Sequence, residues 1–233
     1  MIFGLILYVV LLVSLVVHEA AHALFALWGG DRTAYVGGQV SLNPLPHIRR
    51  EPFGTVILPV GMLLLSGGTS CIGYAHIPVD PVWAYRHPRK AALMSAAGPL
   101  SNFMLVAIAA LVAKVLIEMD WITTARTASV LDVLVPVDGA REGPLKAACM
   151  ILMAFMYINL LLGMLNLIPV PPLDGSGVVG GLFPRSAGRF FDTMRSQPMF
   201  GLIAILAVFY LMNSYGFQAV AFAFNHIIFP LFR

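Results

Sequence analysis

The sequence predicts an all-α polytopic membrane protein, a single domain over residues 1–233 formed by about five to six transmembrane helices. Of its 233 residues, 59% are hydrophobic and 11% are charged; a soluble domain carries roughly twice that charged fraction. Apolar runs of a length suited to membrane helices also recur along the chain. The net charge of +3 comes without a basic block, so we expect a lipid bilayer and not nucleic acid as a partner.

The apolar runs define the expected elements in order. They lie near 2–27, 53–67, 92–117, 147–168, 199–213 and 215–231. The first run has no basic segment before it and no small-residue cleavage site, so it is expected to be a retained spanning helix and not a signal peptide. The last two runs are short, and they fit either two tilted spans or one span followed by a surface helix.

The stretch 28–52 between the first two runs favours a small β-hairpin or an edge-like strand. Thr33, Tyr35, Val36 and Val40 are β-prone residues, and a turn signal follows at Asn43-Pro44.

The run 53–67 is too short for an ordinary span. As a helix it would measure roughly 22 Å, and it contains Pro59 and two glycines. If it does not cross, basic residues gather on one face, as the positive-inside rule expects of the cytoplasmic side. In the first part of the chain these residues are Arg32, Arg49, Arg50, Arg86, Arg89 and Lys90. We therefore expect a re-entrant or surface-lying segment.

A histidine pair inside the first apolar run indicates a metal site. His18 and His22 are four residues apart, so on a helix they share one face. Two such imidazoles can hold one zinc ion, with Glu19 beside the metal as a general base. Polar groups at this depth are costly, which favours a chemical role for them.

A catalytic zinc site needs a third protein ligand, and Asp174 is the best candidate. It follows a break at Pro169, Pro171 and Pro172 after the fourth apolar run. Gly175 is expected to permit an unusual backbone angle that turns the carboxylate inward. If 53–67 does not cross, the helices 2–27 and 147–168 run in the same direction, and Asp174 lies on the same side as the histidines.

Several motifs in this order resemble the site-2 protease family of intramembrane zinc metalloproteases, in its compact prokaryotic branch without a PDZ or CBS domain. They are HEAAH at 18–22, LNPLPHI at 42–48, PFGT at 52–55, GPLSN at 98–102 and NLIPVPPLDG at 166–175. The resemblance implies a three-helix catalytic core from 2–27, 92–117 and 147–168, within about 1–183, followed by C-terminal membrane helices at about 198–231.

The resemblance also implies the site and the reaction. One zinc ion would be bound by His18, His22 and Asp174, with Glu19 as the catalytic base, and Asn166 and Pro169 would help to position an unwound substrate strand. Asn166 fits equally a role in satisfying backbone groups that the prolines free. The expected reaction is hydrolysis of peptide bonds in or near a transmembrane segment of a substrate protein. The active site is expected to open toward the cytoplasmic side of a prokaryotic cell membrane.

Three points complete the interpretation. An exposed strand edge near 34–42 could hold the unwound substrate by β-addition. Asn102 is expected to link helices or to support the backbone next to Pro99. The alternative function is a membrane metal-binding or transport protein that uses the same ligands without hydrolysis, and the oligomeric state is left open.

Overall fold

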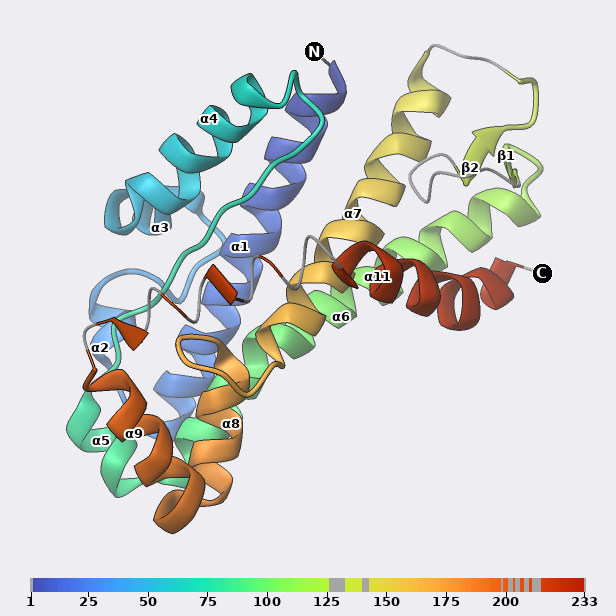
Figure 1. Cartoon of the computed structure of the whole chain (residues 1–233). Coiled ribbons are helices and arrows are strands. Elements are labelled where there is room, and N and C mark those ends of the chain that lie inside the picture. Colours follow the sequence, from blue (N-terminus) through green and yellow to red (C-terminus); the bar gives the residue numbers. More distant parts are fainter. Residues whose placement is uncertain are drawn as a thin grey trace.

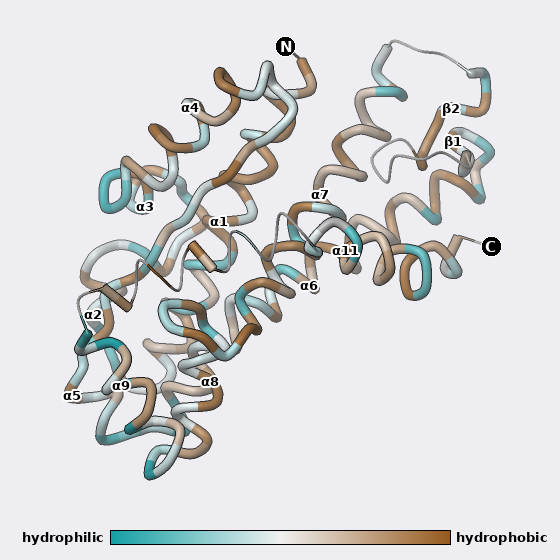
Figure 2. Tube along the Cα trace, in the orientation of Figure 1, coloured by the Kyte–Doolittle hydropathy of each residue, from teal (hydrophilic) through white to brown (hydrophobic). Residues whose placement is uncertain are grey.

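The computed structural model shows a mostly helical protein (Figure 1). It describes residues 2–125, 133–139, 143–197, 199–200, 203, 206–207, 210 and 215–232. Within these residues, three helices are long and apolar enough to cross a membrane: α1 (Ile2–Gly29), α6 (Pro88–Glu118) and α7 (Pro144–Asn166). Figure 2 shows hydrophobic residues along much of these helices, and hydrophilic residues near α3, α9 and the two strands.

The remaining elements are short. The first group comprises α2 (Thr33–Val36), α3 (Pro44–Arg50), the π-helical turn η1 (Phe53–Ile57), α4 (Leu58–Leu65) and α5 (Pro81–Arg86). After α7 come α8 (Asp174–Leu182), η3 (Pro184–Gly188), α9 (Arg189–Arg195), α11 (Phe217–Ala223), η5 (Phe224–Ile228) and η6 (Phe229–Phe232). Several helices begin with proline at the first turn, where its missing N–H leaves no hydrogen bond unmade.

The three long helices pack as a bundle in which α1 and α7 run parallel and α6 runs antiparallel to them. Ser14 of α1 meets Asn159 of α7, and His18, one turn further along α1, meets Asn102 of α6. His22, another turn on, meets the earlier residue Met94 of α6. Between α1 and α7 lies one apolar cluster of Leu7, Val10, Leu11, Leu15, Ala154, Ile158 and Leu162.

The segment from η1 to α5 forms a re-entrant element that folds back on itself beside α1. It starts beside the middle of α1, where Gly54 and Leu11 both lie against Gly73. Gly68, beyond α4, lies against Gly4 near the start of α1. The chain then runs back along α1 (Figure 1) until the Asp80 N–H donates to Asp31 Oδ2 at 2.9 Å, just past the end of α1. The chain thus turns back beside α1, and whether 53–67 crosses the membrane stays a prediction.

The expected hairpin at 28–52 is wrong. Residues there form α2 and α3. The N-cap of α3 is Asn43, whose side chain accepts from the Leu45 N–H. Asp31 lies one residue before the N-cap of α2 and accepts hydrogen bonds from Thr33. The strands occur elsewhere. β1 (Ile122–Thr124) pairs antiparallel with β2 (Leu134–Pro136) at the far end of α6. The exposed strand edge expected near 34–42 is therefore absent from these described residues.

The expected count of five to six transmembrane helices is not confirmed by the described residues, which contain three candidate spans. Most of the run near 199–213 lies outside the described residues. The final run, 215–231, contains α11, η5 and η6, which are short. Val220, Ala223, Phe224 and Ile228 from this run pack on α6 and α7 in one buried cluster.

Candidate metal centre

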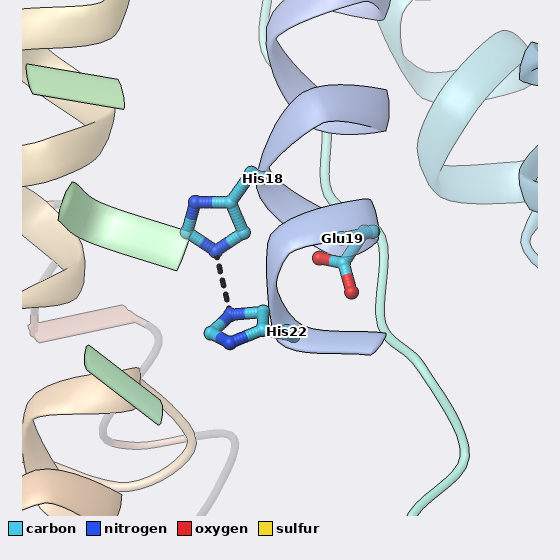
Figure 3. A group of neighbouring side chains, drawn as sticks. All are labelled: His18, Glu19 and His22. Carbon is cyan, nitrogen blue, oxygen red and sulfur yellow. Dashed lines mark hydrogen bonds between the residues drawn. The ribbon is translucent and has the colours of Figure 1, made fainter. Parts of the chain in front are cut away.

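Helix α1 places His18 and His22 one turn apart, and Figure 3 shows both rings projecting from the same side of that helix. Each histidine is only 5% exposed. The helical spacing predicted from the sequence is thus realised within a buried part of the bundle. Burial of two imidazoles in an apolar helix is costly unless their nitrogens are bonded.

Three donor atoms converge at this point. The Nε2 atoms of His18 and His22 lie 3.0 Å apart. Asp174 Oδ2 lies 3.1 Å from His18 Nε2 and 3.2 Å from His22 Nε2. Ligands on a tetrahedral zinc at about 2.0–2.1 Å are separated by roughly 3.3 Å, so the observed spacing is close to that of a metal-bound set.

Asp174 reaches the histidines because the chain breaks after α7. This helix ends at Asn166, the turn 167–173 follows, and Asp174 begins α8. The proline break expected from the sequence is therefore present. Gly175 does not take the unusual backbone angle that was expected, since it is not among the glycines with positive φ. Its role is space instead: a Cβ there would overlap the carbonyl oxygens of Leu167 and Ile168.

Both imidazoles are oriented through their other nitrogen. His22 Nδ1 donates to the Met94 carbonyl oxygen at 2.7 Å, and a carbonyl can only accept. His18 Nδ1 lies 2.6 Å from Asn102 Oδ1. With the proton on Nδ1 in each ring, both Nε2 atoms present lone pairs to each other and to the Asp174 carboxylate. Such hydrogen-bonded histidines are typical metal ligands.

This donor set fits zinc. Three lone-pair atoms about 3 Å apart repel one another in a buried site unless a cation lies between them. Gly98 of α6 keeps the space open, because a Cβ there would lie 2.6 Å from His18 Nε2 and closer still to His22 Nε2. Two neutral imidazoles and one carboxylate are also among the zinc ligand sets used by hydrolytic enzymes.

Glu19 lies beside this donor set. It is 4% exposed, and candidate ligand atoms of His18, Glu19 and His22 all lie within 4.8 Å of one another. In Figure 3 its side chain leaves α1 on a different side from the two histidines. Its Oε2 atom is buried without a hydrogen-bond partner among the described residues. An unpaired buried carboxylate oxygen is costly in an apolar bundle, which favours a chemical use for it.

The two residues expected to position substrate lie near the break. Asn166 Nδ2 donates to the Leu162 carbonyl oxygen of its own helix at 3.1 Å, and Pro169 is exposed in the turn. The Asn166 amide therefore bonds to the backbone of its own helix. Its Oδ1 atom takes no part in that bond, and a role in substrate binding stays a prediction for both residues.

Sequence reasoning missed two residues behind the histidines. Asn159 and Ser14 are both fully buried, and they extend the contact between His18 and Asn102 into a chain of hydrogen bonds across the bundle. Asn102 was expected only to link helices, yet it also contacts His18. An asparagine in the middle of an apolar helix is itself a signal of function, and Asn159 could have been found on that ground.

The fold and the site define a helical membrane protein with a buried His-His-Asp donor set and a glutamate beside it. Residues 6–211 match Peptidase family M50. The chain therefore belongs to this family, the site-2-type peptidases.

Two bacterial proteins are similar along most of the chain. "Putative zinc metalloprotease YwhC" of Bacillus subtilis is 30% identical over 203 residues, which cover 86% of this chain and 78% of the relative. "Putative zinc metalloprotease Rip2" of Mycolicibacterium smegmatis is 26% identical over 218 residues, which cover 92% of this chain and 71% of the relative. No solved structure matches the chain.

Proposed function

We propose that this protein is an intramembrane zinc metalloprotease that hydrolyses peptide bonds in or near transmembrane segments of substrate proteins. The observation that carries the proposal is the convergence of His18, His22 and Asp174 inside a bundle of membrane-type helices. Family membership and the names of the two relatives support a zinc-dependent peptidase. One ion would be held by the three converging atoms.

In this proposal each residue has a distinct task. Zinc, when bound, supplies Lewis acidity that activates a water molecule and polarises the scissile carbonyl. Glu19 accepts the proton of the attacking water on its unpaired Oε2 and passes it to the leaving amine. Asn166 and Pro169, beside the break in α7, would contact the substrate strand after it unwinds. Unwinding is needed because a substrate helix hides its peptide bonds within its own hydrogen bonds.

The depth of the site suits a membrane-embedded substrate. His18 lies eleven residues before the end of α1 at Gly29, about 16 Å along the axis. Arg32, Arg86 and Lys90 gather at this end, and Lys90 Nζ donates to the Gly29 carbonyl oxygen at 3.0 Å. Positive residues favour the cytoplasmic side. We therefore propose that the site opens toward the cytoplasm of a prokaryotic cell.

The proposal extends to the whole chain. Residues 1–233 would form a single domain in the lipid bilayer, with a catalytic core at about 1–183. The C-terminal part at about 198–231 would add membrane helices to the three candidate spans, giving five to six in total. The partner would be a transmembrane protein substrate.

Substitution of the general base tests the function. Glu19→Gln should retain zinc in the purified protein, because its three proposed ligands are intact, yet lose cleavage of transmembrane substrates. Cleavage is measured by comparing the membrane proteomes of cells that express the wild type or Glu19→Gln. Asp174→Ala should lose zinc, and unchanged zinc content would remove Asp174 from the ligand set. If Glu19→Gln impairs metal flux into vesicles and no protein is ever cleaved, the protein is a transporter and not a protease.

A further inference from the structure

A chain of buried hydrogen bonds joins the three long helices behind the metal site. His18 Nδ1 of α1 lies 2.6 Å from Asn102 Oδ1 of α6. Asn102 Nδ2 donates to Asn159 Oδ1 of α7 at 2.7 Å, and Asn159 Nδ2 donates to Ser14 Oγ of α1 at 2.8 Å. Ser14, Asn102 and Asn159 are each 0% exposed, so water does not compete for these bonds.

The direction of every bond in this chain is set by two backbone carbonyls. Ser14 Oγ donates its single hydrogen to the Val10 carbonyl oxygen at 2.7 Å, so toward Asn159 it can only accept. Asn159 Nδ2 also donates to the Phe155 carbonyl oxygen at 2.9 Å. Both contacts demand a donor from Asn159, and its NH₂ group must therefore face them.

The orientation of Asn159 then fixes the two groups that follow. Because its NH₂ group is engaged, Asn159 presents Oδ1 to Asn102, and Asn102 must donate to it from Nδ2. Asn102 consequently presents Oδ1 to His18. An amide oxygen can only accept, so His18 must carry a proton on Nδ1, and in the neutral ring that binds a metal the lone pair is then on Nε2.

We propose that Asn159 is a positioning residue that holds His18 in its metal-binding tautomer, acting through Asn102. The proposal rests on the proposed zinc ligation by His18. His22 needs no such relay, because it donates directly to the Met94 backbone carbonyl, which a side-chain substitution leaves in place. The two histidines of the motif are therefore unequal, and only His18 depends on a residue of α7.

Removal of the Asn159 acceptor should release the Asn102 amide. In Asn159→Leu, nothing holds Asn102 Nδ2 toward α7, so the amide can rotate and donate Nδ2 to His18 Nδ1. The ring proton then moves to Nε2. This atom, which faces Asp174, would no longer have a lone pair to bind the metal. Asn159→Asp is the matched rescue, since a neutral carboxylic acid keeps both a carbonyl acceptor and a hydroxyl donor in the same shape.

The first test measures the zinc dissociation constant of the purified full-length protein in detergent, by competition with a chelating dye. Asn159→Leu should weaken zinc binding by about 10–100-fold, the usual effect of losing a group that orients a ligand. Asn159→Asp should bind close to wild type, as should Ser14→Ala, since the Phe155 carbonyl still holds the Asn159 NH₂ group. Met153→Ala is the packing control, because Met153 is fully buried on the same helix and belongs to an apolar cluster.

A second measurement does not depend on how Asn159→Leu folds. Nitrogen-15 spectra of the metal-free wild type, with His18 assigned through His18→Gln, should show its proton on Nδ1. A His18 ring that carries no proton on Nδ1 would overturn the proposal. So would wild-type zinc affinity in a folded Asn159→Leu, or an equal loss of affinity in Met153→Ala.

The outcomes also separate this inference from the function on which it rests. If the wild type binds zinc and His18→Gln weakens that binding, but Asn159→Leu does not, only the role of Asn159 falls. If the wild type binds no zinc, or His18→Gln binds it equally well, the proposed metal centre falls and takes this inference with it.

Discussion

At the scale of single residues, the donor set depends as much on an absent side chain as on those present. Gly98 lies where α6 faces the two imidazoles of α1, and a Cβ at this position would occupy the space in which the Nε2 atoms meet. Glycine weakens a helix by roughly 0.5–1 kcal/mol relative to alanine. Its use in a long membrane helix is therefore explained by the room that the site requires.

Gly98→Ala should abolish zinc binding while the protein stays folded. The added methyl group would press on both Nε2 atoms and separate them from Asp174, whereas alanine favours the helix itself. Zinc content of the purified protein and its circular dichroism report the two effects separately. Gly61→Ala is the control, because a Cβ at Gly61 of α4 meets nothing within 4 Å. Full zinc occupancy in Gly98→Ala would show that the metal does not bind between these rings.

At the scale of elements, the Asp31 carboxylate links two segments outside the three-helix bundle, the start of α2 and the residues before α5. Asp31 is 3% exposed, accepts from Thr33 at the start of α2, and accepts from the Asp80 N–H before α5. Burial raises the pKa of the Asp31 carboxyl, but the hydrogen bonds from Thr33 and Asp80 lower this pKa by more, so it lies below its ordinary value of 3.8. The charged form is thus the one that holds the re-entrant element to the end of α1.

Stability should therefore fall in acid through Asp31. A carboxyl with a lowered pKa stabilises the folded state above pH 3.8, and this contribution is lost as the pH falls through the folded-state pKa. At neutral pH, Asp31→Asn should lower the free energy of unfolding by about 1–3 kcal/mol. The difference from wild type should shrink below the folded-state pKa, as measured by thermal unfolding in detergent between pH 7 and pH 2.

The control for this effect is Asp192→Asn, since the Asp192 side chain is 71% exposed. It should leave the stability and its pH dependence close to wild type. A difference between wild type and Asp31→Asn that persisted unchanged to pH 2 would show that charge on Asp31 does not hold the element.

At the scale of the whole molecule, the path of the chain brings distant segments to one end. The re-entrant element begins beside the middle of α1, where Gly54 and Leu11 both lie against Gly73. It finishes beside the end of α1, where Trp83 Nε1 donates to the Gly29 carbonyl oxygen at 3.1 Å. Helix α6 then leads away to the strands at the other end, and α7 returns parallel to α1. This arrangement allows the turn after α7 to meet the histidines of α1.

The topology is testable by labelling single cysteines from either side of the membrane. Arg32→Cys and Arg86→Cys, in a chain with Cys71→Ala and Cys149→Ala, should react with an impermeant maleimide from the same side. Asp120→Cys should react from the opposite side, because Asp120 follows the far end of α6. Whole cells and inverted vesicles give the two accessibilities. Labelling of positions 32 and 86 from opposite sides would mean that the segment between them crosses.

The long helices and the sites on them could be predicted because the signals are local and strong. Apolar runs of spanning length and a histidine pair at helical spacing do not depend on distant contacts. The prediction of a hairpin at 28–52 was wrong because the local signals there are weak. Thr33, Tyr35 and Val36 favour strands only weakly, and the hydrogen bonds from Thr33 to Asp31 favour a helical turn there.

The relations between helices could not be predicted in the same way. An apolar run does not say which of its faces meets which neighbour, so neither Asn159 nor the space at Gly98 could be placed against His18. Gly175 was singled out for the wrong cause, since the close approach of the Leu167 carbonyl oxygen is a tertiary contact. The direction of α7 was predictable only because charge and the need for a third ligand agreed.

The separation of Asp174 from the histidines has a consequence for how the protein is made. Asp174 follows His22 by 152 residues, so at 5–20 residues per second it leaves the ribosome roughly 8–30 s later. Helix α1 is already in the bilayer during this interval, with two imidazoles and no carboxylate to complete the set. The His-His-Asp donor set can therefore be completed only after α7 and the turn that follows it have been made, when the other two long helices are already present to surround it.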